Sequence, residues 1–407
     1  MNHVIVVGAG PSGMMAAIAA ARKGASVTIL ERMDKPGKKL LITGNGRCNL
    51  TNITPLAGDT FRGASPDFVH QILLQFSVGD TLRFFWELGL LTRERDGYIY
   101  PYTDQAGSVL EILLQEIRRL GIKLKTRELV TDIRQSDGRL LAVTETWSYP
   151  CDRIILCAGG KAAPQTGSDG SGYMLAGKCG HHVTPVYPAL TALKTGGNLA
   201  PMLAGTRNYS ALTLEIEGEK ERKESGELQW TEYGVSGIVI FQLSRYAAAA
   251  LAQQKYVRLH IDLMPEYSSE EILALLRKKD ALSDGLSAAD LLTGLLKKKT
   301  MDAFLKLLGK KPFAKGRERF YEDIIALIKD LTLNITGTKS FDMAQVCAGG
   351  VPENEVNPVT LESRKLPGLY FAGELLDVDA VCGGYNLQWA WSSGYTAGTH
   401  AAKSLRC

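Results

Sequence analysis

The sequence predicts an α/β fold in which a parallel-sheet domain is interrupted by an inserted domain, rich first in strands and then in helices. Three short apolar segments that run into glycine, at 4–7, 153–158 and 368–372, predict buried parallel strands. Between the second and the third, alternating apolar residues are followed by a helical pattern. The predicted domain boundaries are 1–188 and 336–407 for the two parts of the first domain, and 189–335 for the insert.

The composition is that of a globular chain. Of the 407 residues, 22% are charged and 45% are hydrophobic, which excludes a wholly disordered chain. The longest apolar runs, such as Ala247–Ala252, are far shorter than the roughly 20 residues of a membrane helix. The first residues form one short apolar strand followed at once by glycines, which is no secretory pattern. We therefore expect a soluble, cytoplasmic protein without membrane contact.

The cysteines and histidines form no metal or disulfide pattern. The seven cysteines stand at 48, 151, 157, 179, 347, 382 and 407, without a CxxC pair, so mostly reduced thiols are expected. The histidines at 3, 70, 260 and 400 are isolated, and no metal is assigned. His181 and His182 follow a predicted helix, where packing is favoured over catalysis. The net charge of +4 does not by itself imply a nucleic-acid partner, and the sequence predicts no oligomeric state.

The first forty residues carry the strongest signal. The strand Val4–Val7 is followed by the GxGxxG sequence Gly8–Gly13, an alanine-rich helix over Met14–Lys23, a second strand over Ala25–Leu30, and Glu31. In such a unit, Gly8 permits the tight turn, Gly10 lets the backbone approach a pyrophosphate, and Gly13 lets helix and strand pack closely. The helix N-terminus offers free N–H groups to phosphates. The acid stands where one would bind ribose hydroxyls, so this unit predicts a dinucleotide site.

The later segments bear on the choice between FAD and NAD. The strand at 153–158 continues into Gly159 and Gly160, and the strand at 368–372 continues into Gly373 and Glu374. An apolar helix over 387–397 follows a second pair of glycines. This layout resembles two-dinucleotide-fold flavoproteins, in which FAD lies extended and the N-terminus of the last helix stabilises the reduced flavin. No second GxGxxG is present, so NADH or NADPH is expected to bind only transiently.

Several motifs resemble the BaiN-like (YhiN-type) FAD-binding flavoprotein family over nearly the whole chain. The matching segments are Gly37–Asn52 with GRCN at 46–49, Thr166–Tyr173, Gly349–Val351, Gly373–Asp379, and Gly383–Ala390 with GGYNLQ at 383–388. The resemblance implies an NAD(P)/FAD-dependent oxidoreductase with non-covalent FAD, which reduces an activated C=C bond. The motifs and the resemblance together assign FAD contacts to Gly8, Gly10, Pro11, Ser12, Gly13, Glu31, Arg32, Lys39, Gly44, Gly46, Arg47, Cys48, Asn49, Val130, Ala158, Gly159, Gly160, Gly373, Glu374, Asp377, Gly383, Gly384, Tyr385, Asn386 and Leu387.

The resemblance leaves several reactions open. The favoured one is reduction of an enone such as a 3-oxo-Δ4 steroid or bile acid, by hydride from flavin that NAD(P)H has reduced. A second is reduction of uridine to dihydrouridine in ribosomal RNA. A small-molecule oxidase and a flavin redox sensor are further alternatives.

Three residues are candidates for catalysis: Arg47, Cys48 and Tyr385. Arg47 is predicted either to stabilise the anionic reduced flavin or substrate, or to form a structural ion pair. Cys48 is either a proton donor or, as we favour, a small packing residue. Tyr385 is a plausible acid or substrate contact. The tyrosines at 98, 100 and 102 line the cleft or fill the core, and the sequence does not distinguish these.

The chain departs from the family pattern in a few places. Asn45 stands where glycine is common, which is harmless because Asn tolerates left-handed backbone. Cys382 replaces the usual threonine. In the insert, Glu232 replaces a histidine and Ile238 a proline. A carboxylic acid at 232 could still transfer a proton if burial raised its pKa.

The insert combines two kinds of pattern. Strands are expected at 212–216 and 257–261, and helices over 268–329, with capping boxes at Ser268 and Ser287. The stretch 297–319 holds nine basic and two acidic residues, which predicts either a solvated surface or an RNA contact. The aromatic residues nearby, Phe304, Phe313, Phe320 and Tyr321, either stack bases or, as we favour, pack in the core.

Overall fold

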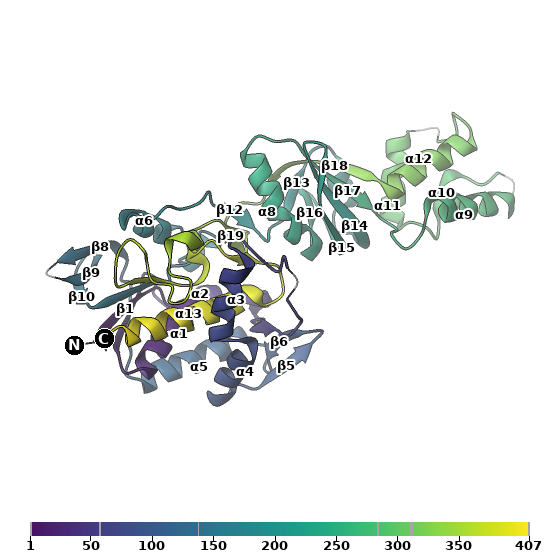
Figure 1. Cartoon of the computed structure of the whole chain (residues 1–407). Helices are drawn as coiled ribbons and strands as arrows, with labels where there is room; N and C mark the ends of the chain where they lie inside the picture. The colour runs from purple at the N-terminus through teal and green to yellow at the C-terminus, as the bar shows by residue number, and fades with distance from the viewer. Residues whose placement is uncertain (1, 57, 137, 283–284, 310–311, 406–407) are drawn as a thin grey trace. The chain divides into compact units, whose positions relative to one another are not determined.

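The chain folds into two compact units (Figure 1). The computed structural model describes residues 2–56, 58–136, 138–282, 285–309 and 312–405. One unit consists of Met1–Tyr187 and Ala344–Cys407, and the other of Pro188–Met343. The insert predicted from the sequence was 189–335.

A five-stranded parallel sheet forms the centre of the first unit, in the order β20-β11-β1-β2-β7. Its strands are β1 (His3–Val7), β2 (Ser26–Glu31), β7 (Lys123–Thr126), β11 (Arg153–Leu156) and β20 (Leu369–Phe371). The three strands predicted from apolar runs ending in glycine are therefore confirmed. Because the strands are parallel, the residues that follow them meet at one edge, where open α/β sheets bind ligands.

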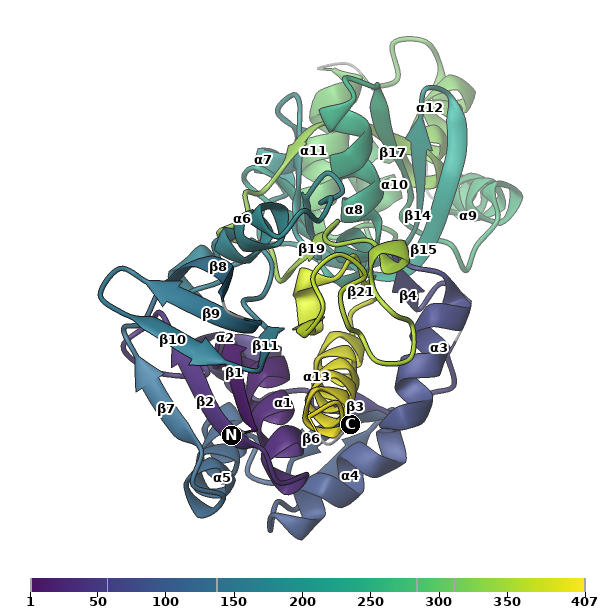
Figure 2. The same ribbon diagram turned by 60° about the vertical axis from the view of Figure 1, so that its left-hand side comes forward.

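Two helices from opposite ends of the chain lie side by side next to this sheet, as Figure 2 shows. They are α1 (Pro11–Arg22) and α13 (Tyr385–Lys403), and α13 begins two residues before the predicted start at 387. Glycines permit the close approach. A Cβ at Gly394 would lie 2.4 Å from the Ser12 carbonyl oxygen, and one at Gly398 would lie 2.2 Å from that of Ala16.

The remaining elements of the first unit surround these layers. The helices are α2 (Lys38–Ile42), α3 (Pro66–Gln75), α4 (Val78–Glu87), α5 (Ala106–Arg119) and α6 (Ser171–Lys178). The short antiparallel sheets comprise β3 (Thr51–Asn52) with β5 (Thr92–Arg95) and β6 (Tyr98–Pro101); β4 (Phe61–Arg62) with β21 (Asp379–Ala380); and β8 (Val130–Ser136) with β9 (Arg139–Thr144) and β10 (Ser148–Cys151). The strand β19 (Val346–Ala348) lies in the same unit.

The second unit contains a closed six-stranded barrel, in the order β13-β16-β15-β14-β17-β18. Its strands are β13 (Leu193–Thr195), β14 (Arg207–Ile216), β15 (Glu219–Thr231), β16 (Gly234–Ser236), β17 (Val257–Asp262) and β18 (Leu331–Thr338). The predicted strands at 212–216 and 257–261 are confirmed as the antiparallel pair β14 and β17. The helix α8 (Ile238–Ala252) was not predicted, because it is apolar on most sides and shows no amphipathic period.

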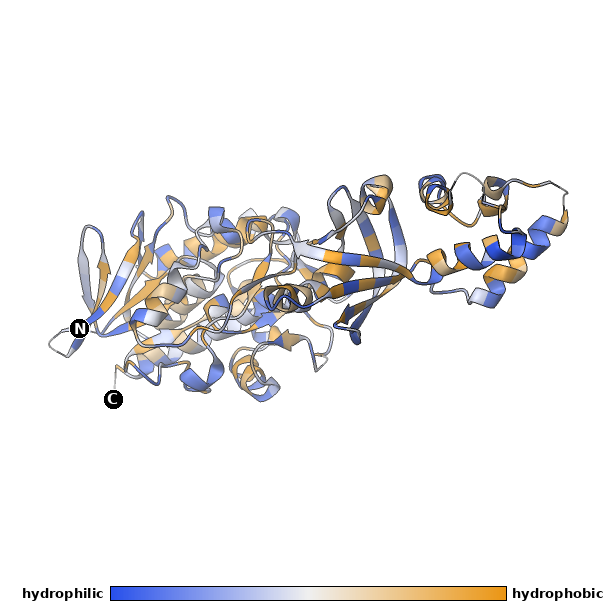
Figure 3. Cartoon of the chain, turned by 90° about the horizontal axis from the view of Figure 1, so that it is seen from above, coloured by the Kyte–Doolittle hydropathy of each residue, from blue (hydrophilic) through white to orange (hydrophobic). Residues whose placement is uncertain are grey.

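The predicted helical segment is also confirmed. It forms α9 (Ser269–Leu282), α10 (Ala288–Leu292), α11 (Lys298–Leu308) and α12 (Arg317–Lys329), preceded in the unit by the short α7 (Leu199–Leu203). Both capping boxes form, at Ser268 with Glu271 and at Ser287 with Asp290. These helices carry hydrophilic and hydrophobic bands side by side (Figure 3), as surface helices over a small core do. Among all described helices, none is long and apolar enough to cross a membrane.

Candidate functional site

The loop between β1 and α1 has the geometry that a pyrophosphate site requires. Gly8 has φ +103°, and a Cβ there would lie 2.5 Å from the Cys157 carbonyl oxygen. A Cβ at Gly13 would lie 2.0 Å from the Gly8 carbonyl oxygen. Gly10 differs, because no described atom beyond its chain neighbours lies within 4 Å of its Cβ position. The first two glycines are thus required by the fold, whereas Gly10 leaves open space at the start of α1, beside Pro11.

The carboxylate of Glu31 lies at the end of β2, against the same loop. One oxygen accepts the Ala9 N–H at 2.7 Å and the other accepts the Met33 N–H at 2.8 Å. Burial raises the pKa of Glu31 above its ordinary value, although both hydrogen bonds act in the opposite direction. Each oxygen keeps a lone pair for a ribose hydroxyl. The neighbouring Arg32 forms an ion pair with Asp169.

The strand–glycine–acid segment after β20 lies beside the N-terminus of α1. A Cβ at Gly373 would lie 2.5 Å from the Ser12 hydroxyl oxygen. Glu374 forms a half-buried ion pair with Lys39, with 2.6 Å between Nζ and Oε2, and accepts the Cys347 N–H at 2.8 Å. Three predicted cofactor residues from distant parts of the sequence, Lys39, Gly373 and Glu374, therefore frame one side of the loop that begins α1.

The loop containing GRCN lies against the start of α13. Gly44 and Asn45 are left-handed, with φ of 56° and 55°, so Asn45 does adopt the backbone that glycine usually provides. A Cβ at Gly384 would lie 2.8 Å from Asn49 Oδ1. This Oδ1 is buried and has no hydrogen-bond partner among the described residues. Gly46 and Arg47 are exposed.

Cys48 is placed differently from the other GRCN residues. It is 0% exposed and belongs to the core of the first unit. Burial raises the pKa of its thiol to about 12. A proton donor must reach its substrate, so the structure favours the packing role over the proton-donor role.

Residues of the GGYNLQ motif fix the first turn of α13. Gln388 is 2% exposed; its oxygen accepts hydrogen bonds from Thr51 at 2.6 Å and Thr81 at 3.1 Å. Asn386 bonds both backbone groups of Ala380, each at 2.9 Å. The sequence analysis did not assign Gln388 a role. Its place within the motif was the available signal, but its partners come from remote strands and helices.

The other predicted cofactor residues lie in three environments. Val130 and Leu387 are buried side chains of the core. Asp377 accepts hydrogen bonds from the Thr184 hydroxyl at 2.8 Å and the Gly349 N–H at 3.1 Å, so both oxygens have structural partners. Ala158, Gly159 and Gly160 follow β11 at the ligand edge, where a Cβ at Gly160 would lie 2.9 Å from Glu374 Oε1.

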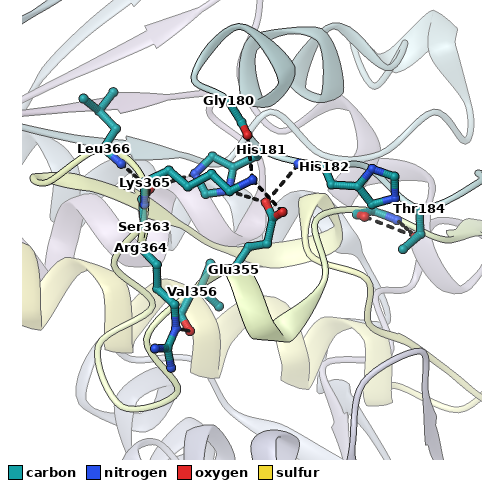
Figure 4. Close-up of polar contacts among 11 residues, drawn as sticks. Gly180, His181, His182, Thr184, Glu355, Val356, Ser363, Arg364, Lys365 and Leu366 are labelled. Carbon is teal, nitrogen blue, oxygen red and sulfur yellow. Dashed lines mark hydrogen bonds and ion pairs between the residues drawn. The ribbon is translucent and has the colours of Figure 1, made fainter.

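The packing role predicted for His181 is confirmed (Figure 4). Its Nδ1 lies 2.8 Å from a Glu355 oxygen and its Nε2 lies 2.7 Å from the Ser363 hydroxyl. Its ring meets the Phe371 ring edge-on at 4.7 Å between centroids. Glu355 also forms an ion pair with Lys365 at 2.7 Å. These contacts tie the end of α6 to residues 355–365, and the ring contact ties it to β20.

The residues at the sheet edge fit FAD. Open space at Gly10, a helix start without a described side-chain cap, and a buried acid at the end of β2 suit the phosphates and a ribose. The unpartnered Asn49 Oδ1 beside Gly384 suits a hydrogen-bond donor of the flavin. The chain would thus hold the cofactor from Gly10 to the start of α13.

In the second unit, most of the described basic residues of 297–319 have partners. Lys298 pairs with Asp302, Arg317 with Asp280, and Arg319 with Glu322 and Asp323. Lys297 and Lys299 donate to the carbonyl oxygens of Arg207 and Ala204. Lys306 and Lys315 have no partner among the described residues, and Lys310 and Lys311 lie outside them.

The aromatic residues of this stretch pack in the core. Phe304, Phe320 and Tyr321 are at most 2% exposed, and Phe313 lies under Arg317. The packing interpretation is confirmed for these rings. Glu232, which replaces the family histidine, is exposed between β15 and β16, so the burial that would make it an acid is lacking in this unit.

Comparisons with known proteins place the chain in a family. A family model described as HI0933-like protein Rossmann domain matches residues 2–400. The chain is 43% identical to a 3-dehydro-bile acid delta(4,6)-reductase of Clostridium scindens, over 99% of this chain and 100% of that protein. It is 30% identical to a ribosomal RNA dihydrouridine synthase of Escherichia coli, over 98% of both chains.

Solved structures also match the chain, at low sequence identity. A flavocytochrome c3 fumarate reductase matches with a TM-score of 0.49 and 15% identity, covering 99% of this chain and 78% of that one. A 3-ketosteroid-delta4-(5alpha)-dehydrogenase of Rhodococcus jostii matches with a TM-score of 0.46 and 16% identity, covering 98% and 96%. Because the family model spans nearly all of the sequence, the chain belongs to the HI0933-like family of Rossmann-domain proteins.

Proposed function

We propose that this protein is an FAD-dependent reductase of an activated C=C bond in a 3-oxo steroid of the bile-acid kind, with NADH or NADPH as the transient donor. The observation that carries the proposal is the 43% identity, over 99% of the chain, to a 3-dehydro-bile acid delta(4,6)-reductase. Similarity over the full length covers the insert as well as the cofactor domain. The role of the insert as the substrate domain is part of the same proposal.

The surroundings of the GRCN loop support an apolar substrate. Ile42, Ile53 and Leu56, which flank the loop in sequence, are 52%, 50% and 49% exposed. Exposed aliphatic side chains beside a cofactor loop suit a ligand that is mostly hydrocarbon and carries few polar groups. FAD, when bound and reduced, supplies the hydride equivalent. The exposed Arg47 is proposed to hold negative charge on the substrate or cofactor.

The test begins with the purified protein. Its visible spectrum should show stoichiometric flavin, which NADH or NADPH should bleach without oxygen. The reduced protein should then convert a 3-oxo-Δ4 steroid to a product with two more hydrogens, measured by mass spectrometry. Flavin that both donors leave oxidised would point to an oxidase or a sensor, and bleaching without steroid turnover would refute the substrate class.

Reduction of uridine in ribosomal RNA is the second candidate, because two relatives at 30% and 29% identity carry that name. The 297–319 stretch supports it weakly, since most of its described basic side chains have intramolecular partners and its rings are mostly buried. The same reduced enzyme is offered unmodified ribosomal RNA. Formation of dihydrouridine, with RNA affinity that falls steeply with salt, would favour this candidate over the steroid.

A further inference from the structure

Tyr98 lies at the junction of β6, β3 and the start of α13. In the antiparallel register, Tyr98 is opposite Asn52. The side-chain amide of Asn52 donates a hydrogen bond of 2.9 Å to the Gly383 carbonyl oxygen. The strand pair therefore holds Tyr98 next to the glycines that precede α13.

The rings of Tyr98 and Tyr385 flank Gly383. A Cβ at Gly383 would lie 3.2 Å from Tyr385 Cε2 and 3.4 Å from Tyr98 Cε1. Gly383 also has φ +136°, which side-chain-bearing residues rarely adopt. The missing side chain thus leaves room for two phenol rings at the entry to the helix.

The hydroxyl groups of Tyr98 and Tyr385 can donate hydrogen bonds, but the described residues around them offer too few acceptors. Tyr385 is hydrogen-bonded to Thr54, whereas the Tyr98 hydroxyl has no hydrogen-bond partner among the described residues. The titratable groups that act on Tyr98 include the Cys382 thiol, the Tyr100 and Tyr385 phenols and the Asp96 carboxylate. Burial raises the pKa of Tyr98, of Tyr385, and of Cys382 (to about 11), so these groups keep their protons at neutral pH. A half-buried set of donors of this kind suits an incoming oxygen acceptor.

We propose that the Tyr98 hydroxyl, with Tyr385 beside it, binds the carbonyl oxygen of the enone substrate. This inference rests on the proposed function. When a hydride equivalent from the reduced cofactor adds to the β-carbon of an enone, the C=C electron pair moves toward the carbonyl and forms an enolate, which then takes a proton from solvent water at the α-carbon. Tyr98 keeps its own proton and donates a hydrogen bond to the oxygen on which the charge develops, so it stabilises the enolate more than the enone.

The experiment compares two ligands and two variants of the FAD-loaded protein. The ligands are a 3-oxo-Δ4 steroid and its 3-deoxy analogue, and their dissociation constants are measured from changes in flavin absorbance. Tyr98→Phe removes the hydroxyl, and Tyr395→Phe is the control, since Tyr395 stacks on Phe76 at 4.6 Å elsewhere on α13. We expect Y98F to bind the 3-oxo ligand about tenfold more weakly and the 3-deoxy ligand unchanged. Turnover of the 3-oxo steroid should fall about 100-fold.

Comparing the 3-oxo and 3-deoxy ligands separates the loss of a contact to the carbonyl oxygen from general damage to the binding site. Equal losses for both ligands, or no loss for either relative to Y395F, would overturn the inference and leave the reductase proposal intact. Failure of the wild-type protein to bind or reduce the steroid would refute the proposed function, and the inference with it. If Y98F loses FAD, the same pair is measured with Tyr385→Phe, for which we expect about a threefold loss confined to the 3-oxo ligand.

Discussion

Two glycines three residues apart should respond in opposite ways to the same added methyl group. At Gly13, a Cβ would lie 2.0 Å from the Gly8 carbonyl oxygen, so Gly13→Ala must move backbone and should lower the free energy of unfolding by about 3 kcal/mol. At Gly10, φ is −80° and no described atom beyond the chain neighbours lies within 4 Å of the Cβ position. Gly10→Ala should therefore leave the apoprotein as stable as the wild type, or up to about 1 kcal/mol more stable. The methyl group would instead occupy the space proposed for the pyrophosphate.

The assay separates folding from cofactor affinity. Urea unfolding of the apoprotein gives the stability, and quenching of FAD fluorescence gives the dissociation constant. For G10A we expect FAD affinity at least about 100-fold weaker, because phosphate would lose backbone contacts worth about 3 kcal/mol in total. Gly107→Ala, at another open glycine position in α5, should change neither cofactor affinity nor fold. G10A protein that binds FAD like the wild type would refute the placement of the pyrophosphate at this loop.

Further predictions concern residues that the structure assigns to packing or support. Burial lowers the pKa of His181 below 6.5, so the folded state binds fewer protons than the unfolded state as pH falls through that value. The resulting stability is complete above about pH 6.5 and is lost toward lower pH, so His181→Gln should flatten the decline in urea stability between about pH 7 and pH 5, and an unchanged pH profile would contradict this assignment. Gln388→Leu leaves the buried Thr51 hydroxyl without its acceptor and removes the hydrogen bond to the Phe76 carbonyl oxygen, whereas Thr81 keeps the Ser77 carbonyl oxygen as acceptor; we expect a loss of about 2 kcal/mol in urea unfolding, and an unchanged midpoint would contradict the network. Cys48→Ala should keep wild-type turnover with a stability loss of about 1 kcal/mol, and a 100-fold slower FAD-loaded variant would restore the proton-donor role.

Features that depend on residues close together in the sequence could be predicted from it. The strand β1 and the glycines after it were predictable because a buried parallel strand is apolar throughout and a tight turn needs glycine. The capping box at Ser287 was predictable for the same reason, since both partners lie within one turn.

Features that depend on remote partners could not be predicted in this way. The helix α8 buries one face, with Val239, Ile240 and Leu243 in the core of the second unit, but its less buried positions are also largely apolar, so its sequence shows little helical period. Gln388 joins Thr51, Thr81 and the Phe76 carbonyl oxygen, three groups more than 300 residues away in sequence. The meeting of Tyr98 with Gly383 likewise depends on the pairing of β3 with β6.

The packing of α1 against α13 has a consequence for the order in which the protein is made. The barrel unit is one continuous stretch, Pro188–Met343, with a core of its own, so it can fold while synthesis continues. The cofactor domain cannot, because the face of α1 that receives Gly394 and Gly398 stays uncovered until α13 leaves the ribosome. The domain whose synthesis begins first is therefore the later one to mature, and FAD, whose proposed site needs Gly373 and Gly384 in place, is captured as one of the last steps.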